Sequence, residues 1–243
     1  MFVLETSDEV IVYNGPQISA EYSVFIDKAA FEITTDISNC VIHYTTDGSV
    51  PTKESAIAKG INEVNISSSF LIKALCFRGE SAISGLTEKR LIKEVPVPAI
   101  AVRETKTGLE YRYFEGVWDR LPDFSVLKPM SKGIAQSIDL TVKKRNNDYG
   151  LIFSGYLWVP ETAVYQFYLT SNDGSQMIIS GKTLSNNGLH GMDQKSMDFA
   201  LGKGFHPIEV QFFQAGGGDG LKLEWKAIGN NRAVIDCSYL RHQ

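Results

Sequence analysis

Short apolar runs with a period of two residues extend along most of the chain. In the stretch 149–181, Tyr165, Phe167 and Leu169 are apolar at alternate positions, which is the period of a sheet with one buried face. No long segment has the 3.6-residue period of an amphipathic helix, so the pattern predicts an all-β protein. The other predicted strands are 10–13, 30–34, 41–46, 62–66, 70–77 and 86–95, followed by the alternating sets 109/111/113, 138/140/142, 197/199/201, 208/210/212 and 221/223/225.

The chain divides near Val95-Pro96-Val97-Pro98, where two alternate prolines interrupt the strand pattern and favour an extended connection. We expect a first domain over residues 1–95, a linker over 96–107 and a second domain over 108–243. About seven short strands separated by turn residues predict an immunoglobulin-like sandwich for the first domain. For the second we expect a larger antiparallel β-sandwich or barrel.

Composition excludes several classes of protein. The 243 residues are 43% hydrophobic and 21% charged, which is typical of a soluble globular protein. A net charge of -4 argues against nucleic acid as a partner, because phosphates require a basic surface. No apolar run approaches the roughly 20 residues of a membrane span, and no secretion signal is visible at the start. We therefore expect no membrane insertion, and we interpret the chain as a piece of a larger protein.

The three cysteines leave two alternatives open. Cys40 and Cys76 share the parity of residues expected to face inward, so they could pair, but two buried thiols are the simpler interpretation. Cys237 has no partner residues arranged around it, and no cysteine has the spacing of a zinc ligand.

A turn motif in the first domain leads to a family. In the segment 42–52, Asp47 can cap its own turn, Gly48 can supply a positive φ, and Pro51 fixes the exit. With the run 70–75, this segment resembles the chitobiase/β-hexosaminidase C-terminal domain, also called the fibronectin-type-III-associated domain. The resemblance covers most of residues 20–93 and implies a spacer module.

The second domain resembles another family through five ordered pieces. They are 121–124, the block 149–181, 188–191, 201–208 and 221–225. Together they resemble the anthrax protective-antigen-type domain, a β-sandwich found in bacterial glycoside hydrolases and yeast adhesins. The resemblance covers about residues 108–241 and implies binding of a glycan rather than its cleavage.

The same resemblance implies a calcium site at one turn. Some members hold Ca²⁺ through two adjacent aspartates joined by a cis peptide, and the matching positions here are Asn172 and Asp173. An amide oxygen still suits calcium, but the site loses one charge. Asp219, in the loop 216–220, is a third candidate ligand because its neighbouring glycines permit close approach. Two interpretations stay open: a calcium site, or residues that only close a hairpin.

Candidate sugar contacts are Asp173, Asn187, His190, Asp219 and Trp118. Amides, carboxylates and an imidazole suit hydrogen bonds to vicinal hydroxyls, and an exposed indole can stack on a sugar ring. Turns that need left-handed residues explain some of these positions equally well.

Catalytic signatures are absent from the sequence. It has no nucleophile elbow, no dinucleotide fingerprint, no zinc spacing and no paired carboxylates on a recognisable catalytic scaffold. We expect a non-catalytic, carbohydrate-binding accessory region of an extracytoplasmic bacterial glycoside hydrolase, such as a β-hexosaminidase or a fucosidase. Its partners would be a glycan and a catalytic domain in the same chain. The alternative is a spacer or protein-docking module without affinity for sugars.

Overall fold

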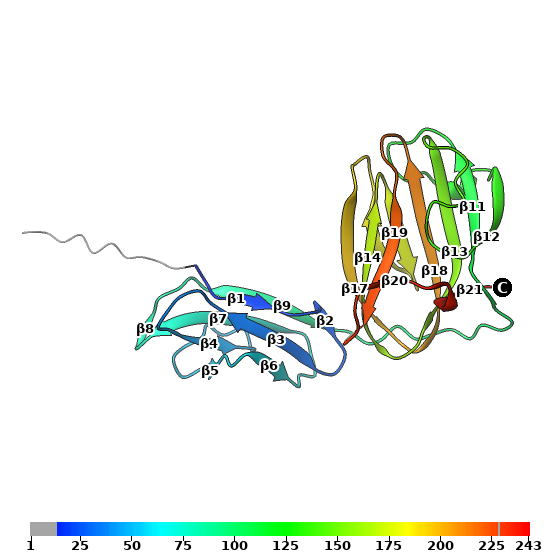
Figure 1. The fold of residues 1–243 in the computed structure, drawn as a ribbon. Coiled ribbons are helices and arrows are strands. Elements are labelled where there is room, and N and C mark those ends of the chain that lie inside the picture. Colours follow the sequence, from blue (N-terminus) through cyan, green and yellow to red (C-terminus); the bar gives the residue numbers. More distant parts are fainter. Residues whose placement is uncertain (1–13, 228) are drawn as a thin grey trace, which may run out of the picture. The chain divides into compact units, whose positions relative to one another are not determined.

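The computed structural model describes residues 14–227 and 229–243, and the chain divides into two compact units between Glu94 and Val95 (Figure 1). The units are described separately below. Within the described residues the elements are strands and two short 3₁₀ turns, η1 (Phe124–Val126) and η2 (Cys237–Tyr239), so the all-β prediction is confirmed. The run 10–13 lies outside the described residues. None of the described helical turns is long or apolar enough to cross a membrane.

The first unit is a sandwich of two small sheets. The Phe31, Phe70 and Ile72 side chains come from both sheets and meet in one buried cluster. This arrangement is the predicted immunoglobulin-like architecture. One sheet has the order β1 (Gln17–Ser19), β3 (Ala29–Thr34), β6 (Ile61–Val64); the other has the order β2 (Val24–Phe25), β9 (Thr87–Lys93), β7 (Phe70–Arg78), β4 (Val41–Thr45), β5 (Ala56–Ile57), with β8 (Ser81–Ala82) beside β7.

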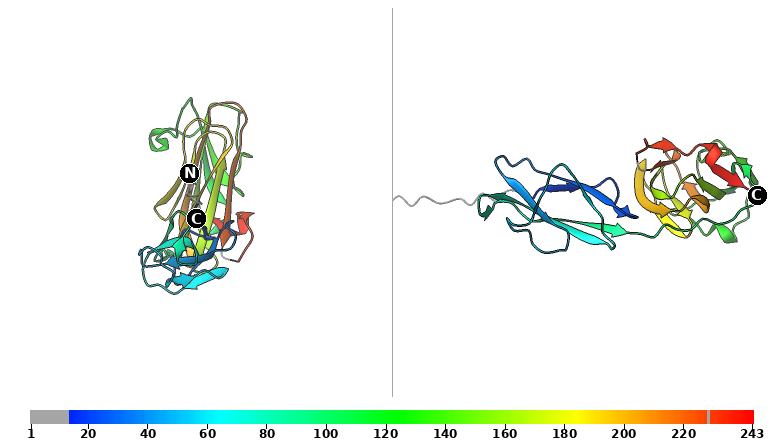
Figure 2. Two further views of the ribbon diagram at one scale, coloured as in Figure 1. Left: turned by 90° about the vertical axis from the view of Figure 1, so that its left-hand side faces the viewer. Right: turned by 90° about the horizontal axis from the view of Figure 1, so that it is seen from below.

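The second unit contains two larger sheets that enclose one core. Figure 2 shows its strands surrounding a common interior. The large sheet has the order β10 (Lys106–Thr107), β21 (Leu240–His242), β13 (Tyr149–Val159), β18 (Gly204–Gln214), β15 (Ser175–Ile179), β16 (Lys182–Asn186), with β11 (Leu109–Glu115) beside β13 and β12 (Ser131–Ala135) beside β11. The small sheet has the order β17 (Asp193–Leu201), β14 (Ala163–Ser171), β19 (Leu221–Ala227), β20 (Ala233–Val234).

Most of the alternating apolar residues of the second unit face this core, as the period-two pattern predicted; Met197, which is 41% exposed, is an exception. Phe167 and Leu169 on β14, and Val210 and Phe212 on β18, are fully buried in one cluster. On the large sheet the opposite set of residues points outward, so Ser154 and Glu209 lie on its outer face. The outer face of the large sheet is therefore lined by polar side chains at these positions.

Two stretches differ from the sequence interpretation. Ile138 is buried as expected, but residues 136–148 form turns and no strand. The segment 96–107, expected to be a linker, is hydrogen-bonded along the second unit, for example from Val97 N to Ala200 O and from Ile100 N to Phe205 O, both at 2.9 Å. Prolines at 96 and 98 leave the intervening Val97 N–H available to donate, so the alternation that interrupts a regular strand still allows single bridges.

The turn at Asp47 is built as its sequence predicted. Asp47 Oδ1 accepts hydrogen bonds from Ser49 N at 2.9 Å and from Ser49 Oγ at 2.6 Å, and Gly48 has a φ of 84°. These bonds lower the pKa of the Asp47 carboxyl. The cysteines are free thiols: Cys76 is buried, whereas Cys40 is half-buried and donates to Ile37 O.

Candidate functional site at the loop edge

Three loops that cross between the two sheets meet at one end of the second unit, and we call them together the loop edge: residues 171–175, 186–193 and 214–221. Strand register brings them together, because Ser171 pairs with Leu221 and Asp193, while Ser175 pairs with Phe212 and Asn186. The ends of strands from both sheets therefore converge there. The three loops that the sequence interpretation selected do lie side by side.

Asp173 joins these loops through its carboxylate. Oδ2 accepts from Ala215 N at 2.9 Å and from Gly216 N at 3.4 Å, while Oδ1 accepts from His190 N at 3.3 Å. Asp173 N in turn donates to His190 O at 2.9 Å. The residue has a φ of 56°, and only 5% of its surface is exposed. Asp173 is therefore buried, and both of its carboxylate oxygens accept backbone N–H groups of the neighbouring loops, so we assign it a positioning role in place of the predicted sugar contact.

The Gln214 amide fills the space between two of the loops. Its Nε2 donates to Gly216 O at 2.7 Å, to Gly218 O at 2.9 Å and to Asn172 Oδ1 at 3.2 Å. Gln214 is fully buried, and its Oε1 has no partner among the described residues. Turning the amide over would place Oε1 against three oxygens, so these contacts fix its orientation.

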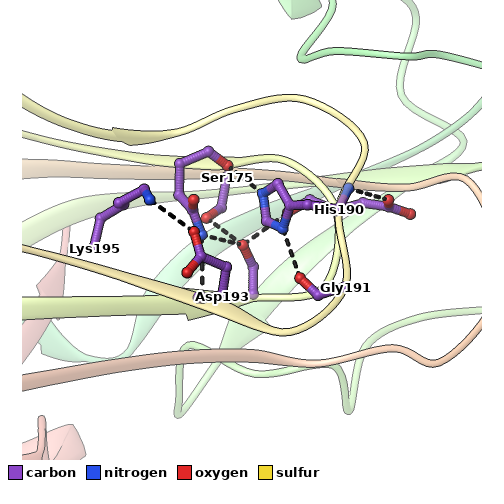
Figure 3. Close-up of polar contacts among 8 residues, drawn as sticks. Ser175, His190, Gly191, Asp193 and Lys195 are labelled. Carbon is purple, nitrogen blue, oxygen red and sulfur yellow. Dashed lines mark hydrogen bonds and ion pairs between the residues drawn. The ribbon is translucent and has the colours of Figure 1, made fainter.

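Buried hydroxyls and an amide complete the interior of the edge. Ser171 Oγ donates to Asp173 O at 2.8 Å and lies 2.7 Å from Ser175 Oγ; Asn186 Nδ2 donates to it at 3.3 Å. The His190 ring lies beside this network, 2.7 Å from Gly191 O through Nδ1 and 3.1 Å from Asn186 O through Nε2 (Figure 3). Both ring nitrogens of His190 are thus directed to the backbone of their own loop. A neutral imidazole can donate to only one of these two carbonyl oxygens, so His190 stabilises this loop through whichever ring nitrogen carries the proton.

The donor set does not fit a calcium ion. The Asn172–Asp173 peptide is trans, because the described residues contain no cis bond. Ca²⁺ needs several oxygens that include carboxylates. Here the Asp173 oxygens accept backbone N–H groups, and the Gln214 amide occupies the point where the neutral oxygens converge. The described residues contain no group of three or more acidic, histidine or cysteine side chains placed to hold a metal.

Asp219 is held by a cation. Its carboxylate forms an ion pair with Lys143, and both side chains are about one quarter exposed, at 27% and 29%. Burial, and then the nearby charge of Asp219, raise the pKa of Tyr149. Asp219 is therefore partly exposed at the edge and paired with a lysine of the 136–148 segment, and it remains able to accept a hydrogen bond from a ligand.

Asn187 and Trp118 connect the edge to the segment 117–127. Asn187 Oδ1 accepts a hydrogen bond from Leu121 N at 2.8 Å. The residue is exposed, and among the described contacts its side-chain NH₂ group has no acceptor. Trp118 was expected to be an exposed ring. It is half-buried instead, with its ring 6.0 Å from that of Phe124 and against Gly150. Gly150 has no side chain, which leaves room for the Phe124 and Trp118 rings against β13.

Two exposed apolar side chains on the edge were missed by the sequence interpretation. Leu189 and Met192 are each 59% exposed, and the Met192 sulfur lies against Gly220. Apolar residues within a glycine-rich turn are the signal that could have identified them, since such a turn gives them no core to enter.

Each unit of the chain matches a known family of domains. Residues 106–239 match the PA14 domain, so the second unit is a PA14-type β-sandwich and the chain belongs to the PA14 domain family. Residues 22–86 match the chitobiase/β-hexosaminidase C-terminal domain. A search of curated proteins found no match.

Three solved structures share the fold. The PA14 domain of the MpAFP antifreeze protein is 17% identical (59% of this chain, 94% of that chain, TM-score 0.50). A PA14 sugar-binding domain from an RTX adhesin is 19% identical (56% and 99%, TM-score 0.50). An anti-sigma factor domain-containing protein is 14% identical and covers 94% of this chain and 84% of its own, with a TM-score of 0.50. At these identities the likeness concerns the fold.

Proposed function

We propose that the second unit binds a glycan at the loop edge and does so without a metal ion. The observation that carries this proposal is the set of backbone hydrogen bonds to Asp173, which joins three loops from both sheets into one preorganised surface. A site that is ordered before binding loses less entropy when the ligand arrives. The fold shared with a PA14 domain described as sugar-binding supports the same conclusion.

The exposed groups of the edge suit a polyhydroxylated ligand. Asn187 supplies amide hydrogens, Asp219 supplies carboxylate oxygens, and the backbone of Gly217 and Gly218 permits close approach. Leu189 supplies an apolar surface for the C–H face of a sugar ring. Asp173, Asn172 and His190 act behind this surface by holding the loops.

The first unit serves as a spacer in this proposal. Its Asp47 turn is satisfied by its own residues, and the chitobiase C-terminal family to which residues 22–86 are similar suggests the context of a glycoside hydrolase. We propose an extracytoplasmic parent enzyme with its catalytic domain elsewhere in the same chain, and no catalytic activity in the 243 residues themselves. The rival proposal is that both units are spacers or protein-docking modules.

A glycan array probed with the full chain tests the proposal. We expect binding to at least one glycan, with equal signals in EDTA and in excess calcium, because both Asp173 carboxylate oxygens already accept backbone N–H groups and the Gln214 amide occupies the point where the neutral oxygens converge. Gly218→Leu places a side chain on the edge where an added Cβ has no atom within 4 Å, so it should fold normally and abolish binding. Ser196→Leu, an exposed position on β17 of the small sheet, is the matched control.

Three results would overturn the proposal. Silence on every glycan in both conditions would favour the spacer. Binding that survives Gly218→Leu would place the site elsewhere, and binding that disappears in EDTA would refute the metal-free edge.

A further inference from the structure

The outer face of the large sheet carries a second groove, separate from the loop edge. One cavity of about 490 Å³ is lined by Glu110, Ser154, Tyr156, Pro207 and Glu209, among others. A second, of about 310 Å³, lies between the 122–125 turn and the residues Arg112, Ile152, Gln211 and Glu209. Glu209 lines both cavities, so they are neighbours on this face, and we call the two together the sheet-face groove.

Strand register explains why these residues converge. Glu110 on β11 pairs with Ser154 on β13, which pairs with Glu209 on β18, so the three side chains form a row across the outer face. Arg112, Ile152 and Gln211 form the next row toward the loop edge. From Gln211 to Pro207 on β18 the groove follows the strand for four residues, or about 13 Å, which is enough for a short oligosaccharide.

The outer face of the large sheet is covered by aromatic side chains at its end nearer the loop edge. Nearer the loop edge, Phe114 and Ile152 are covered by Phe124 and Trp118, and these rings form a small second core. The groove therefore begins where the 117–127 segment ends, and polar rows take the place of the apolar cover.

Polar side chains in the groove are held in fixed orientations. Gln176 Nε2 donates to Gln211 Oε1 at 2.8 Å, and Gln211 Nε2 donates to Glu209 Oε1 at 2.6 Å. The Arg112 guanidinium lies 3.8 Å from Glu209 Oε2. Ile178, Pro207 and Tyr156 add apolar surface beside this chain of hydrogen bonds. Such a mixture of oriented amides and carboxylates with apolar patches is suited to a ligand that has both hydroxyl groups and C–H faces.

We infer that the sheet-face groove binds an uncharged oligosaccharide chain. A peptide is disfavoured because β13 and β18 each pair with strands on both sides, which leaves no free strand edge for a peptide backbone to extend. An acidic glycan is disfavoured by charge, since Glu110, Glu209 and Asp123 outnumber Arg112 along the groove. This groove is a binding site in addition to the loop edge.

Amide NMR titration of the full chain tests this inference. The probes are chitohexaose, cellohexaose, xylohexaose and mannohexaose, with hexagalacturonic acid as the acidic comparison. We expect at least one neutral hexasaccharide to shift the Ser154, Tyr156 and Glu209 amides, and the acidic one to leave them unchanged. Ser154→Trp fills the groove from an outward position and should weaken this binding about tenfold or more.

Controls separate this inference from the proposed function. Thr170→Trp adds the same ring to the outer face of the small sheet and should leave the titration unchanged. Glu209→Gln removes only the charge and should weaken binding several-fold, even if Ser154→Trp fails to fold. Gly218→Leu, which blocks the loop edge, should not alter the groove. Shifts absent with every neutral hexasaccharide, shifts caused by the acidic one, or full binding by Glu209→Gln would overturn the inference.

Discussion

Replacing Asp173 by Asn tests the central physical claim about the loop edge. Asn accepts the left-handed backbone at φ 56° as readily as Asp, so the substitution leaves backbone strain unchanged. It removes the charge and one acceptor oxygen, so an NH₂ group must face backbone N–H groups either at His190 or at Ala215 and Gly216. The substitution therefore isolates the hydrogen bonds that join the loops.

The expected loss follows from the geometry. A hydrogen bond to a charged group contributes about 1.5–3 kcal/mol, and an orphaned buried donor costs about 1–3 kcal/mol. The 2.9 Å bond from Ala215 counts fully, whereas those at 3.3 and 3.4 Å are longer than ideal. The Asn variant keeps one side-chain oxygen, so either the bond from His190 N or the bonds from Ala215 N and Gly216 N survive. We expect the free energy of unfolding to fall by about 2–3 kcal/mol.

Tryptophan fluorescence during urea unfolding measures this loss in the second unit alone. All three tryptophans, Trp118, Trp158 and Trp225, lie in that unit. With a urea dependence of about 2 kcal/mol per molar, the midpoint should fall by about 1–1.5 M. Asp119→Asn, at a side chain that is 76% exposed, is the matched control and should shift the midpoint little. If Asp173→Asn behaved like the Asp119 control, the carboxylate would not be holding the loops.

Two further predictions concern stability. Gly174→Ala should lower the free energy of unfolding by about 1–3 kcal/mol, because its new Cβ would lie 2.2 Å from Phe213 Cε1. Urea midpoints check this against the control Gly218→Ala, which should stay near wild type. An unchanged midpoint for Gly174→Ala would contradict the close contact. Burial raises the pKa of Glu224, but hydrogen bonds and charges from Arg232 and Lys222 outweigh it and leave the pKa below 4.5. The unfolded chain therefore takes up this proton first as the pH falls, so the stabilisation is complete above pH 4.5 and is lost below it. Urea midpoints measured on acidification should fall more steeply for wild type than for Glu224→Gln, and parallel curves would exclude this linkage.

Alternation of apolar residues predicted burial better than it predicted strands. Phe167 and Leu169 are fully buried in a paired strand, as expected. Ile138 is also buried, at 6% exposure, but it reaches the core from a turn segment that pairs with no strand. A period of two records which residues face inward, whereas strand formation also requires a neighbouring strand in register. The sequence of 138–142 contains the first kind of information and not the second.

The tripeptide Asp-Gly-Ser occurs twice in the chain and folds differently each time. At Asp47 the carboxylate accepts from Ser49, two residues away, and a positive-φ glycine completes the turn. At Asp173 it is the aspartate that has the positive φ, and its carboxylate accepts from loops 17 to 43 residues away. Local sequence therefore sufficed to predict the first turn. The role of Asp173 depends on partners that only strand pairing brings close.

The loop edge and the sheet-face groove depend on one ladder of hydrogen bonds. Tyr149 pairs with Gln214 at the edge, and Ser154 pairs with Glu209 in the groove, along the same two strands β13 and β18. A slip of one residue would turn Glu209 toward the core and Val210 toward solvent, so the groove exists only in this register. The bonds from Ala215 and Gly216 to Asp173 hold the end of β18 at the position that this register requires. The buried carboxylate that shapes the loop edge thereby also stabilises the alignment of side chains that forms the groove.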